Sequence, residues 1–141
     1  MAIDANCFKK FSEKQLAVLT WWCSSSRFRN KDAIICDGAV RSGKTVCMSL
    51  SFIFWSFYDF EDTSFALCGK TIASLKRNLI TPMQPLLSSL GFNCKEFHSK
   101  NLIEISYQGR TNRFYLFGGK DEGSAALIQG MTLGGVLLDE V

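Results

Sequence analysis

The stretch Gly38-Ala39-Val40-Arg41-Ser42-Gly43-Lys44-Thr45 decides which fold this sequence can adopt. It consists of a glycine, four variable positions and then Gly-Lys-Thr, the pattern of a loop that wraps backbone amides around the phosphates of a nucleotide. Glycines lack a Cβ, so the backbone can take positive φ and come close to a triphosphate. By chance the pattern occurs in roughly one in two hundred chains of this size. The stretch therefore predicts a nucleotide-binding loop.

Three residues of this loop carry its specific chemistry. Lys44 is placed to reach the β- and γ-phosphates, and the hydroxyl of Thr45 is a ligand for Mg²⁺. Arg41 can reach the nucleotide or pair with an acidic neighbour. We therefore predict that residues 38–45 bind ATP and that Lys44 and Arg41 take part in catalysis.

The segments on either side of the loop fit this interpretation. Ala33-Ile34-Ile35-Cys36 is a short apolar run typical of a buried strand, and residues 46–58 are apolar over a length that favours a helix. A strand, a loop and a helix in this order are what a phosphate-binding loop requires. The alternative is a glycine turn that carries a lysine by chance.

A second candidate element lies near the end of the sequence, where the apolar run Val136-Leu137-Leu138 is followed by Asp139 and Glu140. Alone, such a run is typical of a strand that meets solvent. Beside a phosphate-binding loop, one carboxylate can hold Mg²⁺ and the other can orient or deprotonate the attacking water. We predict Asp139 as the metal ligand and Glu140 as the catalytic base, a pair that favours hydrolysis over simple binding.

The other elements follow from local patterns. Ser12-Glu13-Lys14-Gln15 has the form of a capping box at the start of a helix, so Gln15 is either a cap or an amide for an adenine ring. The remaining expectations are a strand at residues 64–69, a helix at 72–80, a break and new helix at Thr81-Pro82, a hairpin of strands 102–107 and 113–117, and a short helix at 122–128.

Composition excludes several classes of protein. The chain has 141 residues, a net charge of +3 and scattered basic clusters, which permit contact with nucleic acid without arguing for it. Its six cysteines form no Cys-x-x-Cys unit and it has one histidine, so we expect no zinc site and a reducing, cytosolic setting. The most apolar run is shorter than the ~20 residues of a membrane span, so we expect no membrane contact.

In their order along the chain, several of these motifs resemble the N-terminal ATPase region of phage terminase large subunits, most of all the type found in defective prophages of Gram-positive bacteria. The motifs that carry the resemblance are residues 12–15, 38–45, Gly69-Lys70-Thr71, Phe117-Gly118-Gly119-Lys120-Asp121, Gln129-Gly130 and 137–140. The resemblance covers nearly the whole chain. An arginine three positions before the loop lysine, here Arg41, is its most distinctive part.

The resemblance implies one ATPase domain over residues 1–141, with the three-layer αβα fold of P-loop NTPases, a mostly parallel sheet and an inserted β-hairpin. It implies a motor that hydrolyses ATP with Mg²⁺ and drives double-stranded DNA into a procapsid in the cytoplasm of a bacterial host. A homo-oligomeric ring, a small terminase subunit and the portal are the implied partners. In that family Gln15 matches the adenine contact, Lys44 and Thr45 the phosphate and metal contacts, and Asp139 and Glu140 the metal carboxylate and the base.

Two departures from the family limit what we expect. The family continues past Glu140 with a coupling motif, further strands and a nuclease domain, so we expect a fold truncated after the Asp-Glu strand and no nuclease activity. Near Gln129 some relatives carry an arginine that acts across subunits, and the glutamine here cannot. Arg77, Arg110 and Arg113 remain open as candidates for such an arginine.

Other functions stay possible at this point. A helicase-like ATPase predicts downstream unwinding motifs that the sequence lacks. A nucleotide kinase predicts an arginine-rich lid after the loop, which the sequence lacks as well. A non-enzymatic alternative is a prophage remnant that binds nucleotide, or only folds, without turnover.

Overall fold

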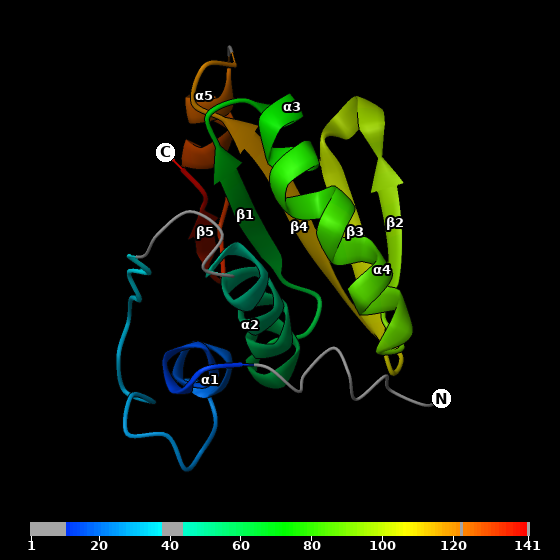
Figure 1. Ribbon diagram of the computed structural model, residues 1–141. Helices are drawn as coiled ribbons and strands as arrows, with labels where there is room; N and C mark the ends of the chain where they lie inside the picture. The colour runs from blue at the N-terminus through cyan, green and yellow to red at the C-terminus, as the bar shows by residue number, and fades with distance from the viewer. Residues whose placement is uncertain (1–10, 38–43, 122, 141) are drawn as a thin grey trace.

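A computed structural model describes residues 11–37, 44–121 and 123–140 of the chain. Helices and strands alternate along most of it, as the α/β expectation requires (Figure 1). Their order is α1 (Glu13–Thr20), α2 (Lys44–Asp59), β1 (Ser64–Gly69), α3 (Ile72–Leu75), the π-helical η2 (Lys76–Ile80), α4 (Thr81–Ser89), β2 (Asn93–Phe97), the 3₁₀ turn η3 (His98–Lys100), β3 (Leu102–Tyr107), β4 (Arg110–Gly118), α5 (Ser124–Gln129) and β5 (Val136–Leu138).

The described strands form one sheet in the order β2-β3-β4-β1-β5. β1 lies between β4 and β5 and is parallel to both, with Leu67 opposite Leu116 on one side and Leu137 on the other. β2, β3 and β4 are antiparallel neighbours. The sheet therefore consists of a parallel part that ends in the Asp139-Glu140 pair and an antiparallel part built on the predicted hairpin.

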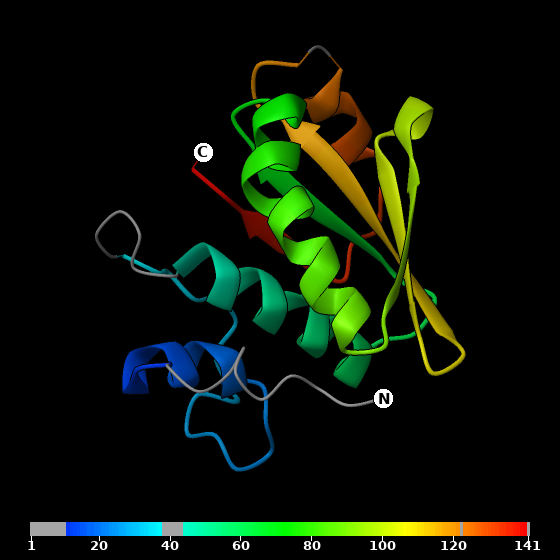
Figure 2. The same cartoon turned by 45° about the vertical axis from the view of Figure 1, so that its right-hand side comes forward.

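Helices cover both faces of this sheet. Figures 1 and 2 show α2, α3 and α4 in front of the strands and α5 behind their upper end. The front face buries the main core, in which Phe65, Phe114 and Ile105 are fully buried against α2 and α4. No helix of the described residues is long and apolar enough to cross a membrane. The predicted α/β fold with an inserted hairpin is confirmed.

Local patterns predicted several boundaries well. Ser12 caps α1 through a hydrogen bond from the backbone N–H of Gln15 to its Oγ, and Gln15 Oε1 accepts from the N–H of Ser12. The helix expected after residues 38–43 spans Lys44–Asp59. The hairpin forms with a shorter turn than expected, because Gln108 and Gly109 both take positive φ and allow β4 to begin at Arg110.

The predicted break at Thr81-Pro82 is wrong. Thr81 is helical rather than an N-cap, and its backbone N–H donates to the carbonyl of Lys76, five residues earlier. A π-helical turn widens the helix at this point, so the run from Ile72 to Ser89 continues past a proline that lacks a donor.

The predicted strand at residues 33–36 is also wrong. These residues take no strand conformation, and Ile35 is 92% exposed. A strand needs a neighbour for its backbone hydrogen bonds, and no described strand lies in the ladder beside this segment. The apolar composition of this segment did not predict its conformation correctly, because formation of a strand depends on pairing with a distant segment.

Candidate functional site

The candidate site residues fall on three separate elements. Lys44 and Thr45 open α2, Asp139 and Glu140 follow β5, and Gln15 lies in the first turn of α1. Residues 38–43, which include Arg41 and both loop glycines, lie outside the described residues. The geometry of the site therefore concerns the end of the loop and the acidic pair.

The parallel part of the sheet brings the acidic pair to the edge where α/β proteins bind ligands. The carboxyl ends of parallel strands meet at one edge, and β1, β4 and β5 all end there. The backbone N–H of Gly119 donates to the carbonyl of Gly69 over 2.9 Å, which ties the ends of β4 and β1 together. Asp139 N–H in turn donates to the carbonyl of Cys68 over 2.8 Å, so the first acid is fixed against β1.

Asp139 is a buried carboxylate that Lys44 influences. Its residue is 7% exposed. Burial, and secondly the adjacent Glu140 carboxylate, raise the pKa of Asp139, whereas the Lys44 ammonium lowers it. An opposite charge shifts a pKa in this way only when it lies near the carboxylate. The structure thus brings together two residues that are 95 positions apart in the sequence, at 44 and 139.

Glu140 has a different setting from its neighbour. It is exposed, and its φ of +53° lies in the left-handed region that a residue with a Cβ adopts at a cost of about 1 kcal/mol. Such outliers are often retained where a side chain must point in a particular direction. The backbone turn at Glu140 makes the two adjacent carboxylates differ, one buried beside β1 and one exposed.

Gln15 acts as a helix cap in this structure. The reciprocal bonds between Gln15 and Ser12 have lengths of 2.9 and 3.2 Å. These two bonds confirm that Gln15 caps the helix. Its contact with adenine stays a prediction.

The donor set at this edge fits magnesium better than a transition metal. Mg²⁺ prefers hard oxygen ligands and usually takes one or two carboxylates together with substrate phosphates and water. Thr45 supplies a hydroxyl and Asp139 a carboxylate whose raised pKa marks an incompletely compensated buried charge. Among the described residues, no group of three or more His, Cys, Asp or Glu side chains could hold a metal without further ligands. Thr45 and Asp139 are thus oxygen donors of the kind that a nucleotide-bound Mg²⁺ takes, and their role as its ligands stays a prediction.

Two residues of motifs named in the sequence analysis support this edge in a role that the sequence did not indicate. Asp121 Oδ2 accepts a hydrogen bond of 2.9 Å from the backbone N–H of Ile72, and Thr71 Oγ1 accepts one of 3.0 Å from the backbone N–H of Ser74. Both bonds cap the helix that follows β1. The Thr71-x-x-Ser74 spacing is a cap signal that could have been found, whereas the role of Asp121 depends on contact with a distant segment.

The candidate arginines do not join the acidic pair within this chain. Arg113 forms an ion pair with Asp62 over 2.7 Å, and its strand position is opposite Ser64, at the end of β1 away from Asp139. Arg110 lies beside the hairpin turn, and Arg77 is exposed in η2. Their proposed action across subunits remains a prediction.

Comparisons with known proteins agree with this fold. The large terminase of a thermophilic bacteriophage matches with a TM-score of 0.90 and 50% identity over 93% of this chain and 32% of that one. The complex of the same terminase with ATP-gamma-S matches with a TM-score of 0.86 and 47% identity, covering 94% and 31%. The chain belongs to the phage large-terminase family. It spans about a third of the length of these terminase chains.

A more distant terminase shares the fold. The large terminase ATPase domain of a Thermus phage matches with a TM-score of 0.57 and 15% identity, over 92% of this chain and 53% of that one. No family model matches the chain, and no curated protein matches it. The fold is the P-loop type of the terminase ATPase domain, as the sequence motifs predicted.

Proposed function

We propose that this terminase chain binds ATP with Mg²⁺ at residues 38–45 and hydrolyses it. The observation that supports the proposal most is the position of Asp139, buried at the end of β5 and bonded through its N–H to the carbonyl of Cys68 in β1, where the Lys44 ammonium lowers its pKa. A lysine and a buried carboxylate at the carboxyl edge of a parallel sheet are the parts that hold a triphosphate and its metal. The related thermophilic-phage terminase was solved in complex with ATP-gamma-S, which agrees with nucleotide binding here.

Each residue has a distinct role in this proposal. The backbone amides of residues 38–43 surround the phosphates, and Lys44 neutralises charge on the β- and γ-phosphates. Thr45 and Asp139 would hold Mg²⁺, which supplies further charge stabilisation when it is bound. Glu140 accepts a proton from the attacking water, and its exposure leaves it accessible to that water. Arg41 stabilises the γ-phosphate, and Gln15 contacts the adenine.

The wider function follows from the family and is also a proposal. The chain contributes the ATPase part of a motor that packages double-stranded DNA into a procapsid in the bacterial cytoplasm. A ring of large subunits, a small terminase subunit and the portal are its partners in this role. The lack of nuclease activity in residues 1–141 stays a prediction.

A second candidate is a form that binds nucleotide without turnover. It is favoured by the exposure of β5, in which Val136 and Leu138 are 47% and 55% exposed, because catalysis requires Glu140 to be held firmly at the end of this strand. Both candidates predict binding, and they differ in hydrolysis.

The test measures ATP binding by calorimetry and phosphate release in the presence of Mg²⁺. We expect the wild type to bind and hydrolyse ATP, Lys44→Ala to lose binding, and Glu140→Gln to bind while turnover falls by about 10²-fold or more. Lys70→Ala is the matched control, because Lys70 is an exposed lysine at the same edge of the sheet. Absence of binding in the wild type contradicts the proposal. Equal inertness of the wild type and Glu140→Gln, with both binding ATP, establishes the second candidate.

A further inference from the structure

The end of α2 that lies away from Lys44 lines an aromatic pocket of about 280 Å³. Among the described residues, its lining is aromatic apart from one leucine and one arginine: Trp22, Phe54, Phe57, Tyr58, Phe92, Tyr107, Leu90 and Arg110. Tyr107 and Arg110 flank the turn between β3 and β4, and Figures 1 and 2 show this turn at the opposite end of the sheet from the carboxyl end of β1. The pocket is therefore separate from the candidate nucleotide site.

The aromatic side chains of the pocket extend from the core to the surface. Phe57 and Phe92 are buried, with ring centroids 5.4 Å apart, whereas Tyr58 is 51% exposed. Two pairs of rings line the pocket: Trp22 with Tyr58 at 5.0 Å, and Phe92 with Tyr107, stacked at 4.3 Å. Flat apolar faces are thus available to a ligand from solvent.

The polar groups of this pocket are mainly hydrogen-bond donors. Trp22 Nε1 is buried and has no hydrogen-bond partner among the described residues, although a buried indole N–H usually has one. The Tyr107 hydroxyl accepts from Gln108 Nε2 over 3.3 Å, which leaves its own proton to donate. The Arg110 guanidinium forms no ion pair with a described residue. A ligand that supplies carbonyl or carboxylate oxygens therefore fits these groups best.

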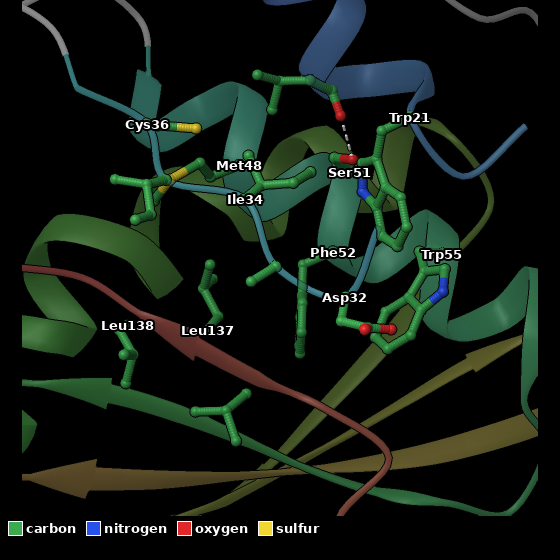
Figure 3. Close-up of a pocket in the computed structure, with 14 residues that line it drawn as sticks. Trp21, Asp32, Ile34, Cys36, Met48, Ser51, Phe52, Trp55, Leu137 and Leu138 are labelled. Carbon is green, nitrogen blue, oxygen red and sulfur yellow. Dashed lines mark hydrogen bonds between the residues drawn. The ribbon is translucent and has the colours of Figure 1, made fainter. Parts of the chain in front are cut away.

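A larger cavity beside β5 has the opposite charge (Figure 3). Its volume is about 350 Å³, and Met48, Phe52 and Trp55 of α2 line it together with the segment 32–36. Asp32 is the charged side chain among its described lining residues. An acidic ligand is therefore repelled by the larger cavity and attracted by the aromatic pocket at Arg110.

We propose that the aromatic pocket binds a proline-rich peptide segment that carries an acidic residue. Aromatic-lined grooves recognise proline-rich segments, whose extended helix is already formed and loses little entropy on binding. Proline offers a carbonyl but no backbone N–H, so a pocket that supplies mainly donors leaves no proline group without a partner. The acidic residue of the peptide pairs with Arg110.

The size of the pocket also favours part of a peptide over a whole small molecule. Pockets that enclose a small molecule typically measure ~300–1,000 Å³. This pocket measures about 280 Å³ and has an exposed rim at Tyr58. Recognition of a nucleobase by its edge needs acceptors as well as donors, and the described lining has no carboxylate or amide side chain. The proposal concerns a partner protein and does not depend on ATP hydrolysis.

The test measures binding of fluorescein-labelled peptides by fluorescence anisotropy. The panel consists of polyproline peptides with a single glutamate at successive positions, and the control peptides carry lysine in place of glutamate or alanine in place of proline. We expect at least one glutamate peptide to bind, and each replacement to weaken its binding at least tenfold. Failure of every glutamate peptide, or equal binding of the alanine control, overturns the proposal. Self-association, or binding of a single-stranded oligonucleotide, that Tyr58→Ala abolishes assigns the pocket to a second copy or to nucleic acid and also overturns it.

A charge reversal tests the position of the peptide. Arg110→Gln should weaken binding by about fivefold or more. Arg110→Glu should bind the lysine peptide more tightly than the glutamate peptide, because only a direct ion pair reverses its preference in this way. Arg77→Gln is the matched control, since Arg77 is exposed in η2 and does not line the pocket. Unchanged affinity for Arg110→Gln, or an equal loss for Arg77→Gln, contradicts the proposal.

A further variant, Trp22→Phe, tests the indole N–H. It keeps an aromatic ring but removes the donor, so peptide binding should weaken by about fivefold while circular dichroism shows the native fold. Unchanged binding by the folded variant contradicts the proposal. If this variant fails to fold, the charge reversal at Arg110 alone decides.

Discussion

The two sides of the sheet differ in how completely they are covered. On the hairpin side, β4 has a strand on each edge and its Phe114 is fully buried, stacked on Phe65 with ring centroids 5.2 Å apart. On the other side, β5 is three residues long and Val136 and Leu138 are about half exposed. The acidic pair of the candidate site follows the weakly covered strand. The residues that stabilise this chain and those proposed for its chemistry therefore lie in different parts of the sheet.

The largest effect on stability is expected from a substitution in the buried core of the hairpin side. Phe114→Ala should lower the free energy of unfolding by about 3–5 kcal/mol, because a buried aromatic ring is removed and a cavity remains. Leu138→Ala should lower it by less than about 0.5 kcal/mol, since its side chain is largely in solvent. Urea unfolding measures both values. Similar losses for the two variants would contradict the comparison.

The next effect concerns a polar residue inside the hairpin side. Asn112 is fully buried; its Oδ1 accepts from the N–H of Thr63 over 2.9 Å, and its Nδ2 donates to the carbonyl of Ser56 over 3.1 Å. Asn112→Ala leaves the Thr63 N–H without its partner, whereas the Ser56 carbonyl keeps the bond from the Phe60 N–H, and the variant should cost about 1–3 kcal/mol in unfolding free energy. Thr111→Val is the control, because Thr111 makes one half-buried hydroxyl contact with Ser106. A loss for Asn112→Ala no larger than that of the control would rule out this anchoring role.

A smaller effect of opposite sign is expected on the β5 side. Asp139→Asn should raise the unfolding free energy by about 1 kcal/mol at neutral pH in metal-free buffer, because it removes a buried charge. Burial, and then Glu140, raise the pKa of Asp139, so the folded chain holds this proton more tightly than the unfolded chain. Stability of the wild type therefore falls as pH rises from the unfolded pKa through the folded pKa, and the benefit of the variant appears over the same interval.

Thermal unfolding at several pH values checks this prediction. The matched control is Asp62→Asn, which removes an exposed carboxylate paired with Arg113 and should destabilise slightly. A destabilising Asp139→Asn at neutral pH would mean that Lys44 outweighs the cost of burial. Excess Mg²⁺ and ATP should reverse the ranking of wild type and Asp139→Asn, because the variant loses a ligand.

The smallest effect is expected in the segment 32–36. Ile35→Ser should change the unfolding free energy by less than about 0.3 kcal/mol, because the side chain is almost fully exposed. A denaturation curve with an unchanged midpoint is the expected result. A loss of about 1 kcal/mol or more would show that this segment packs in solution as a strand does.

Much of this architecture is encoded in short patterns. The capping box at Ser12, the helix after the loop and the hairpin at residues 102–118 were predicted because each depends on neighbours within a few positions. The strand at residues 33–36 and the break at Thr81 were wrong because local patterns do not show the wider setting of either segment. A strand needs a distant partner, and the π-helical turn accommodates a proline that local rules treat as a helix end.

The candidate site was also predictable only in part from local patterns. The residue types of Lys44, Thr45, Asp139 and Glu140 pointed to phosphate and metal chemistry from their spacing alone. Their proximity depends on β5 pairing with β1, which no local pattern specifies. Asp139 is held against β1 by that pairing, and Glu140 takes a positive φ beyond it, so only the structure shows that the two acids have different environments.

The hairpin turn at Gln108 and Gly109 offers a practical attachment point. A side chain added at Gly109 would meet no atom within 4 Å, although its φ of +78° makes substitution there mildly strained. Extra residues inserted between these two positions would project into solvent, and β1 separates β4 from β5 in the sheet. A fluorescent dye or a surface tether attached there would allow the protein to be followed by fluorescence or immobilised, while the edge of the sheet that carries Asp139 and Glu140 stays accessible.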